Sequence, residues 1–379
     1  MFDRSFCFKR IDKMTQCIKI LAVADPAVFA FDDEKLDIFS AFSHKVVFEM
    51  HPWSEYTKLL QLSLSGSGGY DIVMFPGHLF LKDLVDNKQL SPLDFNADKL
   101  RRGLAYDIKM HDRLYAFPAF YDGHIIVFKK GVSARLDAYD NKIIEPDTFI
   151  KLATEDFKGA FSVKAASSEI FTDALPFLRY THNGTIQDIY TQDGLIEKAD
   201  AFTQRLAAYC SLKDSALPGT DKFGNEEVAS ALIKDEAQLI ITWSGQLGLI
   251  DRQMPLDEGY GFATLSTAWN VAWNFGLLES SCNKEICHEL FDYLCCSDID
   301  KKCALYSGTP LYKDTVFDRP WSKALDLLLE HAKPLPFADS SPAKNGLLYE
   351  YIYKAYTGQM DATQALSEAF LKIGAMERS

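Results

Sequence analysis

Three short apolar runs near the start of the chain, separated by stretches with helical spacing, constrain the fold most strongly. The runs IKILAVAD (18–25), VVFEM (46–50) and YDIVMF (70–75) are short and nearly uninterrupted, which is typical of strands buried on both faces. Residues 32–43 and 54–65, which lie between them, are predicted to be helical. Alternating buried strands and helices predict an α/β lobe with a largely parallel sheet.

A long extended segment, LYAFPAFYDGHIIVFKK (114–130), follows this first lobe. It contains Pro118 and the turn pair Asp122-Gly123, is too long for one ordinary strand and is too rich in β-branched residues for a helix. We interpret it as a strand that crosses from one lobe to another. The strand and helix pattern restarts at Glu145, and 379 residues exceed the usual size of one compact core, so two lobes are predicted.

The C-terminal part of the chain contains further crossovers. GYGFATL (259–265) and NVAWNFGLLES (270–280) are interpreted as paired strands that return to the first lobe. Residues 284–305 are predicted to be helical, GTPLYKD (308–314) to cross between lobes, and the last 50 residues to be helices. Several crossovers favour two lobes lying side by side over two domains joined by one linker.

Composition excludes several classes of partner. Apolar residues make up 47% of the chain and charged residues 25%, as in ordinary globular proteins. The net charge of −13 and the pI of about 5.1 argue against nucleic acid or an anionic membrane as a partner. No run reaches 18 uninterrupted apolar residues, so no membrane span is predicted.

The N-terminus and the cysteines bear on the cellular compartment. Residues 1–16, an N-terminal extension, mix charged and apolar side chains, and Lys19 and Asp25 interrupt the next apolar run, so no signal peptide is expected. The cysteines are predicted to be free thiols in a reducing compartment, which suggests a cytoplasmic protein. There are eight of them: Cys7, Cys17, Cys210, Cys282, Cys287, Cys295, Cys296 and Cys303.

Five blocks of sequence, in order, carry a resemblance to a known family. They are SGSGGYDIVMFPGHLFLKDLVDNKQLSPLD (65–94), DRLYAFPAFYDGHIIVFKK (112–130), EEVASALIKDEAQLIITWSGQLGLI (226–250), NKEICHELFDYLCCSDIDKKCALYSGTPLYKD (283–314) and YTGQMDATQALSEAFLKI (356–373). With these blocks the chain resembles the family-1 extracellular solute-binding proteins, the sugar-binding components of ABC importers that include maltose-binding protein. It departs from the family's pattern at Asp235, where a glycine is usual, and at Leu311-Tyr312, where a basic residue is common.

The resemblance implies an α/β fold of the type II periplasmic-binding-protein kind, with a ligand cleft between two lobes joined by hinge crossovers. It implies a small-molecule ligand of the sugar class, an ABC transporter permease as partner, an extracytoplasmic location, a monomer and no cofactor. The predicted lobes are residues 17–120 with 265–308, and residues 121–264 with 309–379. The crossovers expected to absorb a hinge rotation lie near 120–123, 263–266 and 308–311.

Tryptophans near the ends of predicted strands are candidate sugar platforms, because a pyranose packs its C–H face on an aromatic ring while its hydroxyls need polar partners. Trp243, Trp269 and Trp273 lie at positions that the resemblance places at the cleft. Each could equally be a core residue. The neighbours Ser244, Gln246 and Asn274 are candidate hydrogen-bonding partners of the ligand.

Polar residues after the first and third strands and in the crossing segment complete the candidate site. The resemblance places an aromatic and a polar ligand contact at Phe75 and His78, and an acidic contact at Asp122. A carboxylate can accept charge-assisted bonds from two sugar hydroxyls, although Asp122 could also be a turn residue and His78 part of a capped turn. Asp25 could either cap the following turn or contact the ligand.

Other chemistries receive less support. The cysteine-rich segment from Cys282 to Cys303 lacks Cys-x-x-Cys pairs, so no metal site is predicted. No Ser-His-Asp or His-Glu-x-x-His pattern is found, and the chain is not expected to be an enzyme. Two alternatives remain, a cytoplasmic ligand sensor with the same fold, and an enzyme that uses Asp122 and His78 as an acid–base pair in the cleft.

Overall fold

The computed structural model describes residues 17–180, 190–191, 194–195, 199–335 and 341–377. The predicted N-terminal extension, which contains Cys7, lies outside the described residues.

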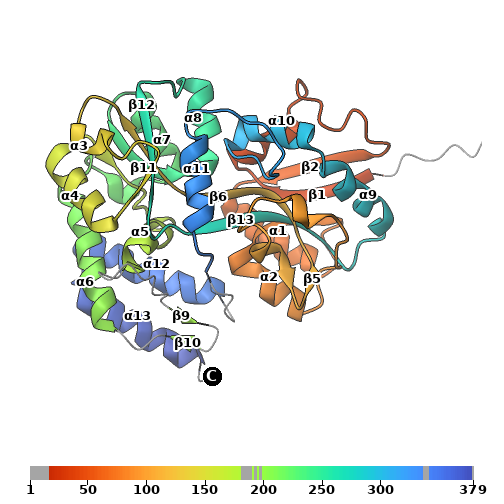
Figure 1. Cartoon of the computed structure of the whole chain (residues 1–379). Coiled ribbons are helices and arrows are strands. Elements are labelled where there is room, and N and C mark those ends of the chain that lie inside the picture. Colours follow the sequence, from red (N-terminus) through yellow and green to blue (C-terminus); the bar gives the residue numbers. More distant parts are fainter. Residues whose placement is uncertain (1–16, 181–189, 192–193, 196–198, 336–340, 378–379) are drawn as a thin grey trace, which may run out of the picture.

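Strands and helices alternate along most of the described chain (Figure 1). The strands are β1 (Cys17–Val23), β2 (Lys45–His51), β3 (Ile72–Pro76), β4 (Lys109–Met110), β5 (Arg113–Leu114), β6 (Phe117–Lys129), β7 (Lys142–Ile144), β8 (Phe161–Ser162), β9 (Tyr190–Thr191), β10 (Gly194–Leu195), β11 (Leu239–Trp243), β12 (Tyr260–Leu265) and β13 (Asn270–Leu277). The α-helices are α1 (Trp53–Leu64), α2 (Gly77–Asp86), α3 (Ala134–Asp137), α4 (Pro146–Asp156), α5 (Ile170–Leu178), α6 (Ala199–Cys210), α7 (Asn225–Ile233), α8 (Leu247–Gln253), α9 (Lys284–Leu294), α10 (Ser297–Ser307), α11 (Ser322–His331), α12 (Ser341–Thr357) and α13 (Ala362–Glu377). Short 3-10 helices include η1 (Pro26–Asp32), η3 (Tyr106–Ile108) and η6 (Ser244–Gln246).

Strand β6 is the element that joins the two halves of the molecule. Nine of the described strands form one sheet, in the order β2-β1-β3-β13-β6-β11-β8, with β12 pairing with β6 and β7. Residues 117–123 of β6 pair with β13, and residues 124–129 pair with β11 and β12. The predicted crossing strand is therefore confirmed, and Figure 1 shows β6 and β13 running between the two sides of the molecule.

The prediction that residues 259–265 and 270–280 form a pair of strands is wrong. β12 and β13 do not pair with each other; each pairs antiparallel with β6, β12 along its second half and β13 along its first. A single long strand can offer a separate partner position in each half of the sheet, so the two shorter strands contribute to different halves.

The helix predicted at residues 32–43 is also absent. Beyond η1 the segment forms turns, and Asp37 has a φ of 44°, a conformation that a right-handed helix does not accommodate. Its aromatic side chains pack instead on neighbouring elements: the Phe39 ring lies 5.9 Å from Phe48 of β2, and the Phe42 ring lies 5.2 Å from Tyr293 of α9. Tertiary packing, not helical periodicity, explains the apolar spacing here.

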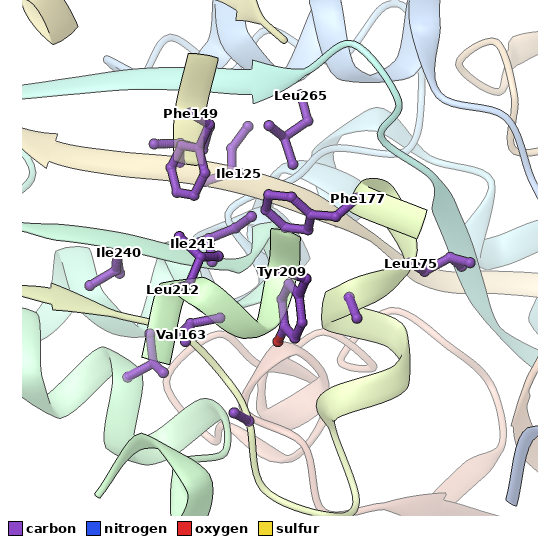
Figure 2. Packing of buried hydrophobic residues seen from close by; sticks show 14 of the residues in the cluster. Ile125, Phe149, Val163, Leu175, Phe177, Tyr209, Leu212, Ile240, Ile241 and Leu265 are labelled. Atoms are coloured by element: carbon purple, nitrogen blue, oxygen red, sulfur yellow. The ribbon is translucent and has the colours of Figure 1, made fainter. Parts of the chain in front are cut away.

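Two hydrophobic clusters form the core, one on each side of the middle of β6. The first contains buried residues of β1, β3, α2, β13, α9 and the first half of β6, and the second contains those of the second half of β6, β11, β12 and α4 to α8 with α12 and α13. We call the elements around them the first lobe and the second lobe. Figure 2 shows part of the second cluster, where Phe149, Phe177 and Tyr209 pack against strand residues such as Ile125 and Ile241. The division into two moving bodies at the predicted residues stays a prediction.

The third crossover, residues 308–314, is fixed by a buried carboxylate. Asp300 of α10 accepts hydrogen bonds from the backbone N–H groups of Leu311 and Tyr312 and from the hydroxyl of Thr315. Because a buried carboxylate is stable only when its oxygens are satisfied, these bonds hold the crossover against the first lobe.

Candidate ligand-binding site

Rings from four segments gather where the two lobes meet. Trp243 ends β11, Trp269 lies between β12 and β13, His124 lies in β6, and His78 lies in the first turn of α2. The ring centroids of Trp243 and Trp269 are 5.4 Å apart, His124 lies 4.2 Å from Trp243, and His78 lies 5.2 Å from Trp269. We call these four residues the seam cluster, because α2 belongs to the first lobe and β11 to the second.

A second aromatic group lies on the first lobe. The indole of Trp273 in β13 stacks on Phe120 of β6 at 5.9 Å and meets Trp53 edge-on at 5.9 Å. Trp53 is 41% exposed and stacks on Tyr56. The sequence analysis passed over Trp53, although its place two residues after the end of β2 is the kind of strand-end position at which ligands bind in α/β sheets.

Two buried charged residues of the second lobe, Lys164 and Asp173, contact members of the seam cluster. The Nζ of Lys164 lies 3.2 Å from Oδ1 of Asp173, and the Nε2 of His124 lies 3.3 Å from the same oxygen. All three side chains are fully buried. Burial, followed by the nearby Lys164 charge, lowers the pKa of His124 to about 4, so the imidazole is neutral at physiological pH. The Lys164 ammonium lies 4.4 Å from the centre of the Trp243 ring, close enough for a cation–π contact.

Asp122 lies at the middle of β6 and is 5% exposed. Its Oδ1 accepts a 2.6 Å hydrogen bond from the backbone N–H of Gly245, and a Cβ at that glycine would come within 2.6 Å of the same oxygen. On the same turn, the hydroxyl of Ser244 accepts a hydrogen bond from the N–H of Gly123. Burial, then the nearby Asp25 charge, raises the pKa of Asp122 to about 8. The turn η6 therefore fixes the acidic side chain of the crossing strand.

Asp25 follows β1 on the opposite lobe. Its Oδ1 accepts a hydrogen bond from the N–H of Ala27 and so caps η1. Burial raises its pKa to about 6. Because η1 packs against η6, whose Gly245 binds Asp122, the capping carboxyl lies on an element next to the turn that holds Asp122.

Several buried polar atoms around the seam have no hydrogen-bond partner within the described residues. Buried polar groups are nearly always paired in native proteins, so such a set calls for an explanation, and an additional partner rich in hydroxyl or amine groups supplies one. They are His78 Nδ1, His124 Nδ1, Gln246 Oε1, Asn270 Nδ2 and Asn274 Oδ1.

The structure brings together some of the residues predicted from the sequence and separates others. Trp243, Trp269 and His78 join in the seam cluster; Asp122, Ser244 and Gln246 meet at η6; and Asp25 faces them. Trp273 belongs to the second aromatic group, the Phe75 ring is fully buried in the core of the first lobe, and Asn274 donates hydrogen bonds to the carbonyls of Asp107 and Ala272. The roles of all ten as ligand contacts stay predictions.

Three members of the site were not predicted at all. His124, Lys164 and Asp173 lie within apolar stretches of the sequence, and only the folded chain brings His124 and Lys164 to within 3.3 Å of Asp173. The one available signal was Lys164, a lone lysine within the apolar segment FSVKAA (161–166), because a charge in such a place must be paired or functional.

The raised pKa of Asp122 predicts a pH effect on stability. Its folded-state pKa of about 8 lies above the ordinary value of 3.8, so between these values the folded chain binds more protons than the unfolded chain. Stability should therefore fall as pH rises through this window, and Asp122→Asn should flatten the dependence. Urea unfolding from about pH 5 to pH 8 measures both slopes. Asp94→Asn, which removes an exposed carboxylate, is the control for charge loss; equal slopes in the Asp122 variant and the original protein would contradict the prediction.

Other kinds of site were also sought. In the part of the chain that the structure describes, no group of three or more histidine, cysteine or acidic residues could hold a metal ion, and its seven cysteines are all free. No described helix is long and apolar enough to span a membrane. A surface pocket of about 430 Å³, lined by residues such as Lys130, Asp140 and Arg319, shares no residue with the seam cluster.

Comparisons with known proteins were made for both the sequence and the structure. No family model matches the sequence, and no curated protein matches it. The structure is similar to MalE3 of T. maritima with bound maltose, with a TM-score of 0.81, 16% identity, and coverage of 95% of this chain and 99% of that one. It is also similar to ABC transporter solute-binding proteins from Agrobacterium radiobacter K84 in complex with ribitol (TM-score 0.79, 13% identity, 95% and 98% covered) and from Thermotoga lettingae with bound α-D-tagatose (0.77, 15%, 94% and 98%).

These likenesses extend over nearly the whole chain, and they agree with the resemblance and the fold class predicted from the sequence. The chain has the two-lobed α/β fold of the ABC transporter solute-binding proteins.

Proposed function

We propose that this chain reversibly binds a small, hydroxyl-rich ligand, a sugar or polyol, between its two lobes, as the substrate-binding component of an ABC importer. The observation that carries the proposal is the seam cluster. It combines two indoles from the second lobe and the crossover with unpartnered polar atoms, the combination that sugars need. The neighbouring structures were solved with maltose, ribitol and α-D-tagatose, which supports the same ligand class.

Binding would act on the equilibrium between open and closed lobes. A ligand that contacts His78 on the first lobe and Trp243 on the second gains more interactions in the closed form, and this difference in affinity favours closure. The three crossovers near residues 120–123, 263–266 and 308–311 are the expected hinges. The closed form would then be recognised by a transporter permease.

Reversible binding, without turnover, is part of the proposal. Among the described residues, no hydrogen bond or ion pair joins His78 and Asp122, the pair that an acid–base mechanism would use. Burial also lowers the pKa of His78 to about 3, which makes it a weak base near neutral pH. Recovery of the ligand unchanged after long incubation would support binding alone, and a hydrolysed or isomerised product would contradict it.

A thermal-shift screen tests the proposed ligand class. The set should contain mono- and disaccharides and polyols, with polyamines and organic anions as the comparison classes. A ligand at 100 times its dissociation constant adds about 2.7 kcal/mol to the free energy of unfolding, which gives a clear rise in melting temperature. A rise with sugars or polyols is expected. The proposal would be contradicted if only organic anions raised the melting temperature, or if no compound of the set raised it.

A further inference from the structure

Three carboxyl groups lie around the seam. Asp25 follows β1, Asp122 lies in β6, and Glu169 precedes α5. In the described part of the chain none of the three forms an ion pair, whereas the neighbouring ammonium of Lys164 is already paired with Asp173. The site therefore contains more carboxyl groups than cationic groups.

The three carboxyl groups lie around the turn η6 and the indole of Trp243. The N–H of Gly245 in η6 holds Asp122, and η6 packs against η1, whose first turn Asp25 caps. Trp243 directly precedes η6, and its side chain is among the groups near Glu169 that lower the pKa of that carboxyl, which burial raises. Burial is the main cause of the raised pKa of Asp122 and of Glu169; the charge of Asp25 adds to it in both groups, and the charge of Lys164 opposes it.

The turn η6 also contains a buried acceptor atom for which the described residues supply no donor. Gln246, next to Gly245, is 2% exposed, and its Oε1 accepts no hydrogen bond within the described residues. Asn274 Oδ1, also buried, accepts none either. An amide oxygen can only accept, so the chemistry that satisfies these atoms and the carboxyls together must be rich in donors.

A protonated amine has these properties. It carries three N–H donors and no acceptor, and its charge-assisted bonds to carboxylates are about twice as strong as neutral ones. The ring of Trp243 already contacts one ammonium, that of Lys164 at 4.4 Å, so cation–π contact occurs in this environment.

We propose that the ligand carries a protonated amine beside its hydroxyls, as an amino sugar does, and that Asp122 and Asp25 bind the amine from the two sides of the seam. This inference rests on the proposed function and narrows its ligand class. Glu169 adds to the negative field, and Gln246 accepts a further hydrogen bond from the amine or an adjacent hydroxyl.

Matched ligand pairs separate this inference from the proposed function. We would titrate the full chain by calorimetry with glucosamine against glucose, and with the β-1,4-linked glucosamine disaccharide against cellobiose, since each pair differs by amine in place of hydroxyl. The amine member should bind at least about tenfold more tightly. Asp122→Asn and Asp25→Asn should each bring the ratio of affinities for the amine and the neutral ligand of a pair towards one. Asp94→Asn, which removes one exposed negative charge, should leave the ratio unchanged because it alters only the long-range field.

The outcomes are distinct. An amine preference that falls in both seam variants and persists in Asp94→Asn supports the inference. Equal or tighter binding of the neutral members overturns it and leaves the proposed function standing. An equal fall of the preference in Asp94→Asn also overturns it, because the preference would then come from net charge. Binding of neither member of either pair, together with a negative sugar and polyol screen, overturns both proposals.

Discussion

Replacing Trp243 with alanine should weaken ligand binding by about 1–3 kcal/mol, roughly 5- to 150-fold in Kd. The indole ends β11 at the point where the lobes meet, and it touches both His124 at 4.2 Å and Trp269 at 5.4 Å. Truncation removes an indole face of the seam cluster and also the cation–π partner of Lys164. Calorimetric titration with a ligand retained by the screen measures the loss.

A conservative variant separates stacking from folding. Trp243 is 7% exposed, so the alanine variant is also expected to be less stable, and its affinity must be measured where it remains folded. Trp243→Phe keeps an aromatic face and should lose less affinity than Trp243→Ala. Unchanged affinity in a folded alanine variant would remove Trp243 from the binding site.

Replacing Gly248 with alanine should destabilise the contact between the lobes by about 1–3 kcal/mol. Gly248 lies in α8 of the second lobe, against the end of α10 of the first. A Cβ at this position would lie 2.2 Å from the carbonyl oxygen of Tyr306 and 2.9 Å from the N–H nitrogen of Gly308. Both neighbours are backbone atoms, so no side-chain rotation can relieve the overlap. Urea unfolding measures the stability change. Ligand titration should show weaker binding because the overlap destabilises the closed form.

Gly346 provides the matched control. It is also a helical glycine, in α12, but a Cβ there would meet nothing within 4 Å. Gly346→Ala should therefore stabilise the chain by about 0.5–1 kcal/mol, since alanine favours the helix. If Gly248→Ala behaved like Gly346→Ala in both stability and affinity, α8 and α10 would not meet as closely as described.

The crossing strand could be predicted because its signal is local. A 17-residue extended run with a proline and an Asp-Gly pair fits no single ordinary strand, and β6 indeed pairs with β13 in one half and with β11 and β12 in the other. Asp235, which stands where the family usually has glycine, keeps a φ of 58°, a left-handed conformation that aspartate tolerates better than most residues. The departure at that position thus leaves the turn intact.

Features that depend on tertiary contacts could not be predicted. The helical spacing of residues 32–43 reflects packing of Phe39 on Phe48 across a turn, because the partner comes from another strand. The site was predicted where residues lie at or just after strand ends, as Trp243 and His78 do, and in the crossing segment, as Asp122 does. His124, Lys164 and Asp173 come from a strand, a loop and a helix. Spacing along the chain does not predict that His124 and Lys164 both contact Asp173.

Small-angle X-ray scattering with and without a retained ligand tests most directly whether the ligand binds between two lobes that close on it. A ligand held by the first lobe through His78 and by the second through Trp243 should reduce the radius of gyration at saturation, because it favours the closed form. Gly248→Ala should have a larger radius than the original chain without ligand and should contract less when ligand is added. An unchanged radius at a ligand concentration that saturates the calorimetric titration would contradict binding by lobe closure.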